Sequence, residues 1–599
     1  MKTLAVTSLL LLLLFAGESL CAPPAADYLI IGGGTAGLVL ANRLSSNPSV
    51  TVTVIEPGGD ERRNPNVSGT DKFSQAFNTP IDWNYTTVPQ PRANNRSLTL
   101  HQGKAWGGTS TINGMTYIRG DARVFDVWEG LGNLGWSWKD LFPYFLKAEN
   151  YTIPTATQVA AGTTYRQGNH GFSGLLRVGY TSALRNGSFA PLIMGTWEDM
   201  GLGKNGDLNA GDVRGYGMGP QTLGRADSEE VRWDAARGYY HPIEGRENLK
   251  MVRGTVRRVL WREDGGGSGK GRLLVAKGVE FVNGEGVVER MEATREVIVS
   301  AGGVRSPLVL EASGIGNPRI LDLLGIETRV NLPGVGENLG GQSVHIMVLS
   351  GEMESSASAY HTYVTAADLF GDSLDKVKNA TRKSLPDWAR TMADVSKGAL
   401  SAQALEEQFR LQYELIFQHN VSVAEVITVS APGGILASNY YVVLPFSRGS
   451  VHLGDLDKID RPVIDPSIFS SDFDITVTTA IGRVVQKFWL SGRIRPLVTG
   501  QLTPDVGVLP ENATDAQWLA HFRQSLDMAA HPRGSAAMMR RELGGVVDPE
   551  LRVYGTANVR VVDASVIPMP ISGHMSATVY AVAERGADII KRTSYGGHP

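Results

Sequence analysis

The chain has 599 residues, of which 42% are hydrophobic, and its formal net charge is only −3, so it is long enough to form two hydrophobic cores. The small charge and the absence of a Lys/Arg block argue against nucleic acid or an anionic membrane as a partner and indicate a small neutral or mixed substrate. The only cysteine, Cys21, excludes an internal disulfide, a thiol nucleophile and a cysteine metal site. Redox chemistry would therefore belong to a bound cofactor.

The N-terminus has the features of a secretory leader. Lys2 supplies a positive start, Leu9–Phe15 lie in an apolar run too short to span a bilayer, and small residues permit cleavage after Cys21 or Ala22. We therefore expect a signal peptide over residues 1–21 and a route to the cell exterior, the cell wall, or a vacuole or vesicle. Eight Asn-x-Ser/Thr acceptor sites are consistent with a glycoprotein: Asn66, Asn84, Asn95, Asn150, Asn186, Asn379, Asn420 and Asn512.

A dinucleotide-binding fingerprint follows between residues 28 and 56. An apolar strand leads into Gly32, Gly34 and Gly37, which permit a sharp turn, a close approach of backbone to a pyrophosphate, and tight packing of the next helix. We expect that helix over 35–44, with Thr35 and Ala36 at the end that holds phosphates. The second strand, 51–56, ends at Glu56, which should bind a ribose hydroxyl. An acid at this point argues against NADP but does not separate NAD from FAD.

The middle of the chain contains a predicted hairpin and a helical region. Residues 251–261 and 273–282 alternate as strands do, so the glycine-rich segment 264–272 between them is interpreted as a hairpin tip, with an interdomain linker as the alternative. Residues 374–417 favour surface helices over a core. The apolar positions at helical spacing in this region are Leu405, Phe409, Tyr413 and Ile416. The chain shows no internal repeat and no second apolar run of membrane length.

Two longer motifs indicate a family. They are GKAWGGTSTINGMTYIRG at 103–120 and SPLVLEASGIG at 306–316. Together with the fingerprint they resemble the glucose-methanol-choline (GMC) oxidoreductases, flavoproteins that oxidise alcohols, over nearly the whole chain after the leader. The resemblance implies a mixed α/β fold, in which a Rossmann-like FAD-binding domain is interleaved with an antiparallel-sheet substrate domain. We expect the FAD-binding region over 25–340, the substrate-domain region over 341–444 and a C-terminal catalytic region over 445–592.

The resemblance also implies where FAD binds. Some relatives attach the flavin through a histidine at the position of Ile112, so this chain should bind FAD without a covalent link. Glycine, threonine and asparagine in the first motif suit a polar cofactor, because they allow close backbone approach and short side-chain hydrogen bonds. No metal is expected. The FAD contacts implied beyond the fingerprint are Gly108, Thr109, Asn113, Gly114, Met115, Thr116, Val256, Asp563, Ala564, Met575 and Ser576.

Two histidines near the C-terminus are the catalytic candidates. His531 precedes Pro532, which favours extended geometry, and His574 lies on a loop before a helix predicted to begin near Ser576. By resemblance, His531 is the general base that takes the hydroxyl proton while hydride passes to flavin N5. His574 would orient the substrate oxygen and share the proton. An imidazole suits both tasks because its reference pKa of about 6.5 leaves much of it neutral near pH 7.

Three departures from the family pattern stand out. The stretch GENLGGQSVH at 336–345 has two glycines where relatives usually continue GENLQDH, so a pocket edge should differ there. Arg533, next to the catalytic histidine, is expected either to meet a substrate carboxylate or phenolate or, more often for arginine, to point away and pair structurally. Gly303 replaces a usual Ala, Ser, Thr or Pro, and we expect this change to add only backbone freedom.

The first functional hypothesis is therefore oxidation of a small aromatic or polyketide-derived alcohol, as in the fungal aryl-alcohol and secondary-metabolite branch of the family. The electron acceptor is O2 or another molecule, and the oligomeric state stays open. The alternative is a non-redox cyclase or lyase that keeps FAD as a scaffold. Flavin reduction by substrate separates the two. A non-catalytic binding protein ranks last because it has no use for both histidines.

Overall fold

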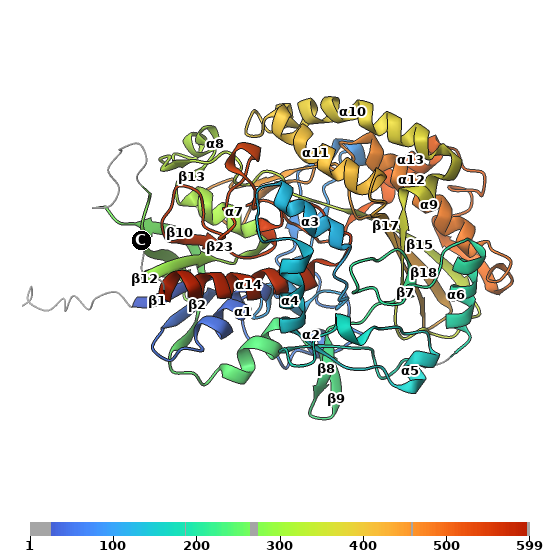
Figure 1. Cartoon of the computed structure of the whole chain (residues 1–599), viewed down its shortest axis with the longest axis horizontal. Helices are drawn as coiled ribbons and strands as arrows, with labels where there is room; N and C mark the ends of the chain where they lie inside the picture. The colour runs from blue at the N-terminus through green and yellow to red at the C-terminus, as the bar shows by residue number, and fades with distance from the viewer. Residues whose placement is uncertain (1–24, 186, 264–272, 457–458, 596–599) are drawn as a thin grey trace, which may run out of the picture.

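Two large β-sheets organise the chain (Figure 1). The computed structural model describes residues 25–185, 187–263, 273–456 and 459–595. The predicted signal peptide, the Asn186 acceptor site and the hairpin tip 264–272 lie outside the described residues.

Helices cover both sheets. Their bounds are α1 Thr35–Leu44, α2 Pro65–Ser68, α3 Ala122–Gly130, α4 Trp138–Ala148, α5 Ala156–Ala160, α6 Phe189–Asp199, α7 Gly302–Ala312, α8 Pro318–Leu323, α9 Ala366–Phe370, α10 Leu374–Val395, α11 Ala402–Phe417, α12 Asp472–Trp489, α13 Asp515–Ser525 and α14 Met575–Tyr595. The described residues contain no helix with the length and apolar character that a membrane span requires.

The first sheet is the Rossmann-like part. Its parallel strands lie in the order β10 (Leu249–Trp261), β2 (Val52–Glu56), β1 (Ala25–Ile31), β12 (Val288–Val299) and β23 (Val559–Val561). β1, β2, β23 and the last three residues of β12 are rich in apolar, β-branched residues and are largely buried, as parallel strands covered on both faces require. The arrangement confirms the predicted dinucleotide-binding fold.

The predicted hairpin is also confirmed. The outer half of β10 pairs antiparallel with β11 (Ala276–Asn283), which in turn pairs with the outer half of β12. The strand that precedes Asp563 is β23, which ends two residues earlier, at Val561. The C-terminal helix α14 packs directly against α1 beside the parallel sheet (Figure 1). There Arg43 Nη2 lies 2.6 Å from the fully buried Glu584 carboxylate.

The second large sheet is antiparallel, as expected for the substrate domain. Trp489 of α12, which packs on this sheet, donates its indole N–H to Ser438 Oγ at 3.0 Å. The strands of this sheet, in spatial order, are β21 Val498–Thr503, β15 Ser343–Gly351, β18 Ile435–Val442, β17 Ser422–Ala431, β16 Tyr360–Thr365 and β7 Gly215–Met218, and β22 Asp527–Met528 also pairs with β15.

The remaining strands form two-stranded pairs around the large sheets. They are β3 Tyr85–Thr86 with β4 Thr99–Leu100, β5 Glu149–Tyr151 with β6 Leu176–Val178, β8 Leu223–Ala226 with β9 Glu229–Arg232, β13 Ile315–Gly316 with β14 Val330–Asn331, and β19 Ser450–His452 with β20 Val463–Asp465.

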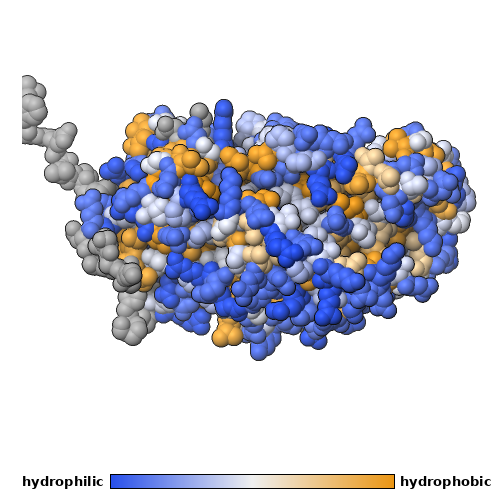
Figure 2. Space-filling view, turned by 90° about the horizontal axis from the view of Figure 1, so that it is seen from above, coloured by the Kyte–Doolittle hydropathy of each residue, from blue (hydrophilic) through white to orange (hydrophobic). Residues whose placement is uncertain are grey.

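The helical region predicted at 374–417 forms α10 and α11, which lie together above the antiparallel sheet in Figure 1. Leu405, Phe409, Tyr413 and Ile416 are all buried, so the predicted core face is confirmed. The face of the molecule that carries these helices is mostly hydrophilic, with apolar residues in small scattered patches (Figure 2).

Candidate active site

A cavity of about 860 Å³ extends from the parallel sheet to the antiparallel sheet. Gly32 and Glu56 line it beside the ends of β1 and β2, and Ile427 and Tyr441 line it on β17 and β18. Ligands of open parallel sheets bind beyond the carboxyl ends of the strands, and the volume lies in the upper range for ligand pockets. The cavity thus has room for an extended cofactor and a small substrate.

The nucleotide end is built by the turn between β1 and α1. Gly34 caps α1 without any side-chain bond to the helix, so the first-turn N–H groups are available to phosphate oxygens. The buried Glu56 carboxylate accepts the N–H groups of Gly33 at 2.9 Å and Gly58 at 2.8 Å, and it lines the cavity. Burial raises the pKa of Glu56. A carboxylate held in this way can bind ribose hydroxyls, so the donor set suits a dinucleotide.

The predicted cofactor residues meet at this cavity, with one exception. Gly37 is absent from the lining, and a Cβ at this position would lie 2.0 Å from the Gly32 carbonyl oxygen. Gly37 therefore lets α1 pack against the turn, as the fingerprint requires, but it does not face the cofactor space. The predicted residues that line the cavity are Gly32, Gly34, Thr35, Ala36, Glu56, Gly108, Thr109, Asn113, Gly114, Met115, Thr116, Val256, Asp563, Ala564, Met575 and Ser576.

His531 lies at the cavity on the loop that follows β22. Its Nδ1 is 2.7 Å from Gln342 Oε1, and the same amide donates from Nε2 to the Val443 carbonyl oxygen at 3.1 Å. Because burial, reinforced by the positive charge of His574 and Arg533, disfavours a cation, the pKa of His531 is lowered to about 3. The ring is therefore neutral at physiological pH.

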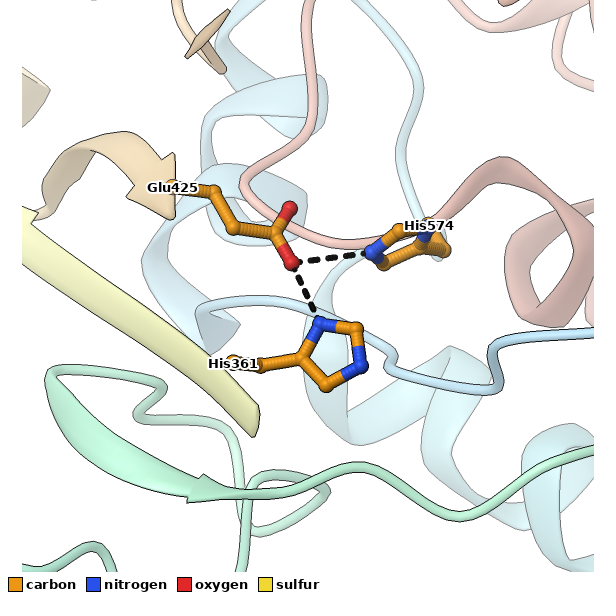
Figure 3. Close-up of side chains that lie close together, drawn as sticks. All are labelled: His361, Glu425 and His574. Carbon is orange, nitrogen blue, oxygen red and sulfur yellow. Dashed lines mark hydrogen bonds and ion pairs between the residues drawn. The ribbon is translucent and has the colours of Figure 1, made fainter. Parts of the chain in front are cut away.

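His574 lies directly before α14 and has a different partner. Its Nε2 is 3.0 Å from Glu425 Oε1, and Nδ1 of His361 is 2.7 Å from the same oxygen (Figure 3). The other carboxylate oxygen accepts the hydroxyl of Tyr441. Burial opposes ionisation, yet the charge of His574 and the hydrogen bonds from both histidines hold the pKa of Glu425 well below its usual range. A buried carboxylate thus faces one of the two predicted catalytic histidines.

The two candidate histidines face each other across the cavity. Their ring centroids are 6.0 Å apart at an interplanar angle of 86°, and the Tyr441 ring lies 6.4 Å from that of His531. One imidazole has a neutral amide as its partner and the other has a carboxylate. Two imidazoles with different hydrogen-bond partners at one cavity can take different parts in proton transfer.

His361, Glu425 and His574 also form a donor set of the kind that zinc or iron accepts. Both imidazole nitrogens, however, lie at hydrogen-bond distances from a carboxylate that Tyr441 also satisfies. We interpret the group as a hydrogen-bond network that orients His574.

Family models for GMC oxidoreductases match residues 26–344 and 445–583 of this chain. The chain is a GMC oxidoreductase. It is thus an FAD-dependent enzyme that acts on CH–OH groups, as predicted from the motifs.

Known proteins resemble this GMC oxidoreductase over almost its whole length. The glucose oxidase-like protein fsoC of Humicola fuscoatra is 55% identical over 95% of this chain and 96% of its own. Glucose oxidase of Aspergillus carbonarius is 33% identical over 94% and 92%. Among solved structures, an FAD-dependent oxidoreductase from Chaetomium thermophilum superposes with a TM-score of 0.85 at 28% identity over 95% and 99%. A fungal aryl-alcohol oxidase gives 0.83 at 26% over 95% and 99%.

Four site residues of this GMC oxidoreductase were missed in the sequence: Gln342, His361, Glu425 and Tyr441. One of them left a signal, since Glu425 is an acid within the apolar strand β17 and is fully buried. A buried charge in a central strand indicates a partner. The partner itself, His574, is 149 residues away and could not be identified from spacing.

Two of the departures from the family pattern prove to be a single structural feature. Arg533 is buried, does not line the cavity, and has no carboxylate partner among the residues that the structure describes. Its Nη1 lies 1.5 Å from where a Cβ of Gly340 would stand. The GMC oxidoreductase therefore has a glycine in the 336–345 stretch because the arginine side chain occupies that space.

The expectation that Gly303 adds only backbone freedom is wrong. A Cβ there would lie 2.2 Å from the carbonyl oxygen of Pro532, the residue after the catalytic candidate. Ser535 Oγ also donates to the Gly303 carbonyl at 2.6 Å. The start of α7 thus packs directly against the loop that carries His531.

Proposed function

We propose that this GMC oxidoreductase oxidises a small neutral alcohol, aromatic or polyketide-derived, to an aldehyde or ketone in secondary metabolism. The observation that carries the proposal is the pair of histidines at one cavity, one with an amide partner and one with a carboxylate partner. FAD, when bound, supplies the acceptor for the hydride from the carbinol carbon. The residues that would hold it are those of the β1–α1 turn, Glu56 and the 108–116 segment.

His531 is proposed as the general base. The Val443 carbonyl can only accept, so the Gln342 amide presents its Nε2 there and its oxygen to His531. Nδ1 of His531 therefore carries the proton, and Nε2 has the free lone pair that can take the hydroxyl proton. Glu425 receives an N–H from His574, so that His574 can hold the substrate oxygen and share the proton.

The lining supports a neutral, largely apolar substrate. At the end of the cavity that reaches the antiparallel sheet, the side chains include Val344, Ile427, Val429 and Met528 beside Tyr441. Arg305 is the only Lys or Arg in the lining contributed by the described ranges, and its guanidinium lies 4.4 Å from the Trp83 ring. The positive charge of Arg305 also attracts the Glu56 carboxylate, at the nucleotide end of the cavity. A substrate carboxylate would thus meet no Lys or Arg side chain in the part of the lining beside the histidines.

Further features of the proposal concern the cofactor link and the location. Ile112, next to Asn113 at the cavity, offers no nucleophile for attachment, so we propose that FAD is bound without a covalent link. Oxygen is proposed as the electron acceptor, in keeping with the oxidases among the relatives. The leader and the acceptor asparagines favour a glycoprotein of the secretory pathway.

An anaerobic absorbance titration tests the function. The purified protein is mixed with a panel of benzylic, heterocyclic and secondary-metabolite alcohols, and the flavin band is recorded before and after air is admitted. Bleaching by an alcohol and recovery in air are the expected results for an oxidase. Conversion of a substrate without bleaching would replace the proposal with the non-redox cyclase or lyase alternative. Flavin in the supernatant after acid precipitation would confirm the non-covalent link.

A further inference from the structure

Gln342 has an unusual position for a buried polar side chain. It immediately precedes β15 and is 6% exposed, and its amide joins the His531 ring to the backbone of Val443. The Val443 carbonyl oxygen lacks a proton to donate, so the orientation of the amide is determined by chemistry. The amide oxygen then faces Nδ1 of His531.

Backbone pairing holds the two partners in register. The Ala529 N–H donates to the Gln342 carbonyl at 2.9 Å, and the Gly340 N–H donates to the Arg533 carbonyl at 2.9 Å. His531 lies between these two bonds. The Arg533 side chain fills the space above Gly340, so the 340–342 segment cannot move toward the loop. The relative position of Gln342 and His531 is therefore fixed by the backbone hydrogen bonds between segments 340–342 and 529–533.

We propose that Gln342 is the positioning residue that fixes the tautomer of His531, with the proton on Nδ1 and the lone pair on Nε2. This inference rests on the proposed function, in which His531 is the base. Gln342 does not line the cavity, so it acts through His531 alone. Its neutral amide selects the tautomer without adding the charge that would favour a permanent imidazolium.

The other charged and titratable groups around His531 do not determine the tautomer. His574 and Glu425 face the ring electrostatically from across the cavity, Arg533 is two residues along the loop, and Tyr441 makes an edge-on ring contact. Among the described residues, Gln342 is the one hydrogen-bond partner of the His531 ring nitrogens.

Two substitutions at Gln342 test the inference in the FAD-loaded enzyme. Gln342→Leu keeps the approximate volume but removes the acceptor, and we expect the rate of anaerobic flavin reduction to fall about 10-fold or more, the factor that one net hydrogen bond provides. Gln342→Glu retains an acceptor and adds a negative charge, which stabilises the imidazolium. The acidic limb of the pH profile for flavin reduction should then move up by about one pH unit or more.

Gln408→Leu is the matched control. Gln408 is 1% exposed and its amide donates to the Leu543 carbonyl at 3.0 Å, yet it contacts no histidine and does not line the cavity. This variant should lose stability in the same way but retain the rate and the pH profile. If Gln342→Leu fails to bind FAD, the profile of Gln342→Glu decides.

The inference is overturned if both Gln342 variants bind FAD and keep the wild-type rate and profile, or if Gln342→Glu leaves the profile unmoved. It is equally overturned if Gln408→Leu reproduces the rate loss, because the effect would then be structural. Failure of the proposed function has a different signature, in which no alcohol reduces the flavin of the wild-type enzyme.

Discussion

Replacing Glu425 with glutamine should separate the two histidines in function. The substitution keeps the size of the side chain but removes the charge that faces His574 Nε2 at 3.0 Å. A hydrogen bond to a charged group is stronger than a neutral one by about 1 kcal/mol. Full loss of the ionic interaction, for charge centres about 4 Å apart at an effective dielectric constant of 20, is worth about 4 kcal/mol. These bounds correspond to rate losses between about 5-fold and 10³-fold, so we expect a loss near 10²-fold.

The assay is stopped-flow flavin reduction under anaerobic conditions. Flavin content should be unchanged, because Glu425 is remote from the nucleotide end of the cavity. Glu311→Gln is the control. Glu311 is equally buried, and its Oε1 lies 2.7 Å from Nδ1 of His452, but neither Glu311 nor His452 lines the cavity. A Glu425→Gln enzyme that reduces flavin within 3-fold of the wild-type rate, a change worth less than about 1 kcal/mol, would refute the reasoning.

Three other outcomes are expected. His531→Ala should retain FAD but lose about 10²-fold in turnover as a general base is removed, and equal turnover in the variant and the parent would exclude the role. Gly340→Ala should lower the thermal midpoint of unfolding because the new Cβ overlaps the Arg533 side chain. The double variant Gly340→Ala/Arg533→Ala removes that side chain and should restore the midpoint, whereas additive losses of stability would disprove the coupling. Burial opposes protonation of His452, but its ring N–H groups donate to the carboxylates of Glu311 and Glu337, and these bonds raise the pKa of His452 to about 10. Folding stability should therefore fall by about 1.4 kcal/mol per pH unit between roughly pH 6.5 and 10. The native state holds this proton over that range and the unfolded chain does not, so urea titrations of His452→Gln should show a flatter dependence.

Local patterns predicted most of the fold. The GxGxxG turn, the α1 helix, the β10–β11 hairpin and the buried face of α11 follow from residue spacing, because each depends on neighbours along the chain. The residues at the nucleotide end of the cavity could also be predicted from the sequence, since they lie within two continuous motifs. The family resemblance added the position of both histidines.

The supporting shell of the histidines was not predictable in the same way. Gln342 and His531 are 189 residues apart, and Glu425 and His574 are 149 apart. These contacts depend on how the antiparallel sheet packs against the C-terminal loops, which no local period encodes. The Gly340–Arg533 pair shows the same limit, because each departure was visible in the sequence but their common cause is steric and three-dimensional.

The cavity is lined by residues from both ends of the described chain, from Ile31 to Val579. A chain still being synthesised can therefore form the phosphate-binding turn long before β23 and α14 have left the ribosome. It has no His574 at that stage, and the last strand of the parallel sheet is missing. Oxidative turnover thus begins only after His574 and α14 have been synthesised and α14 has packed against α1. Because the cofactor turn comes early in the chain and His574 comes late, the nucleotide end of the cavity can form before the catalytic end exists.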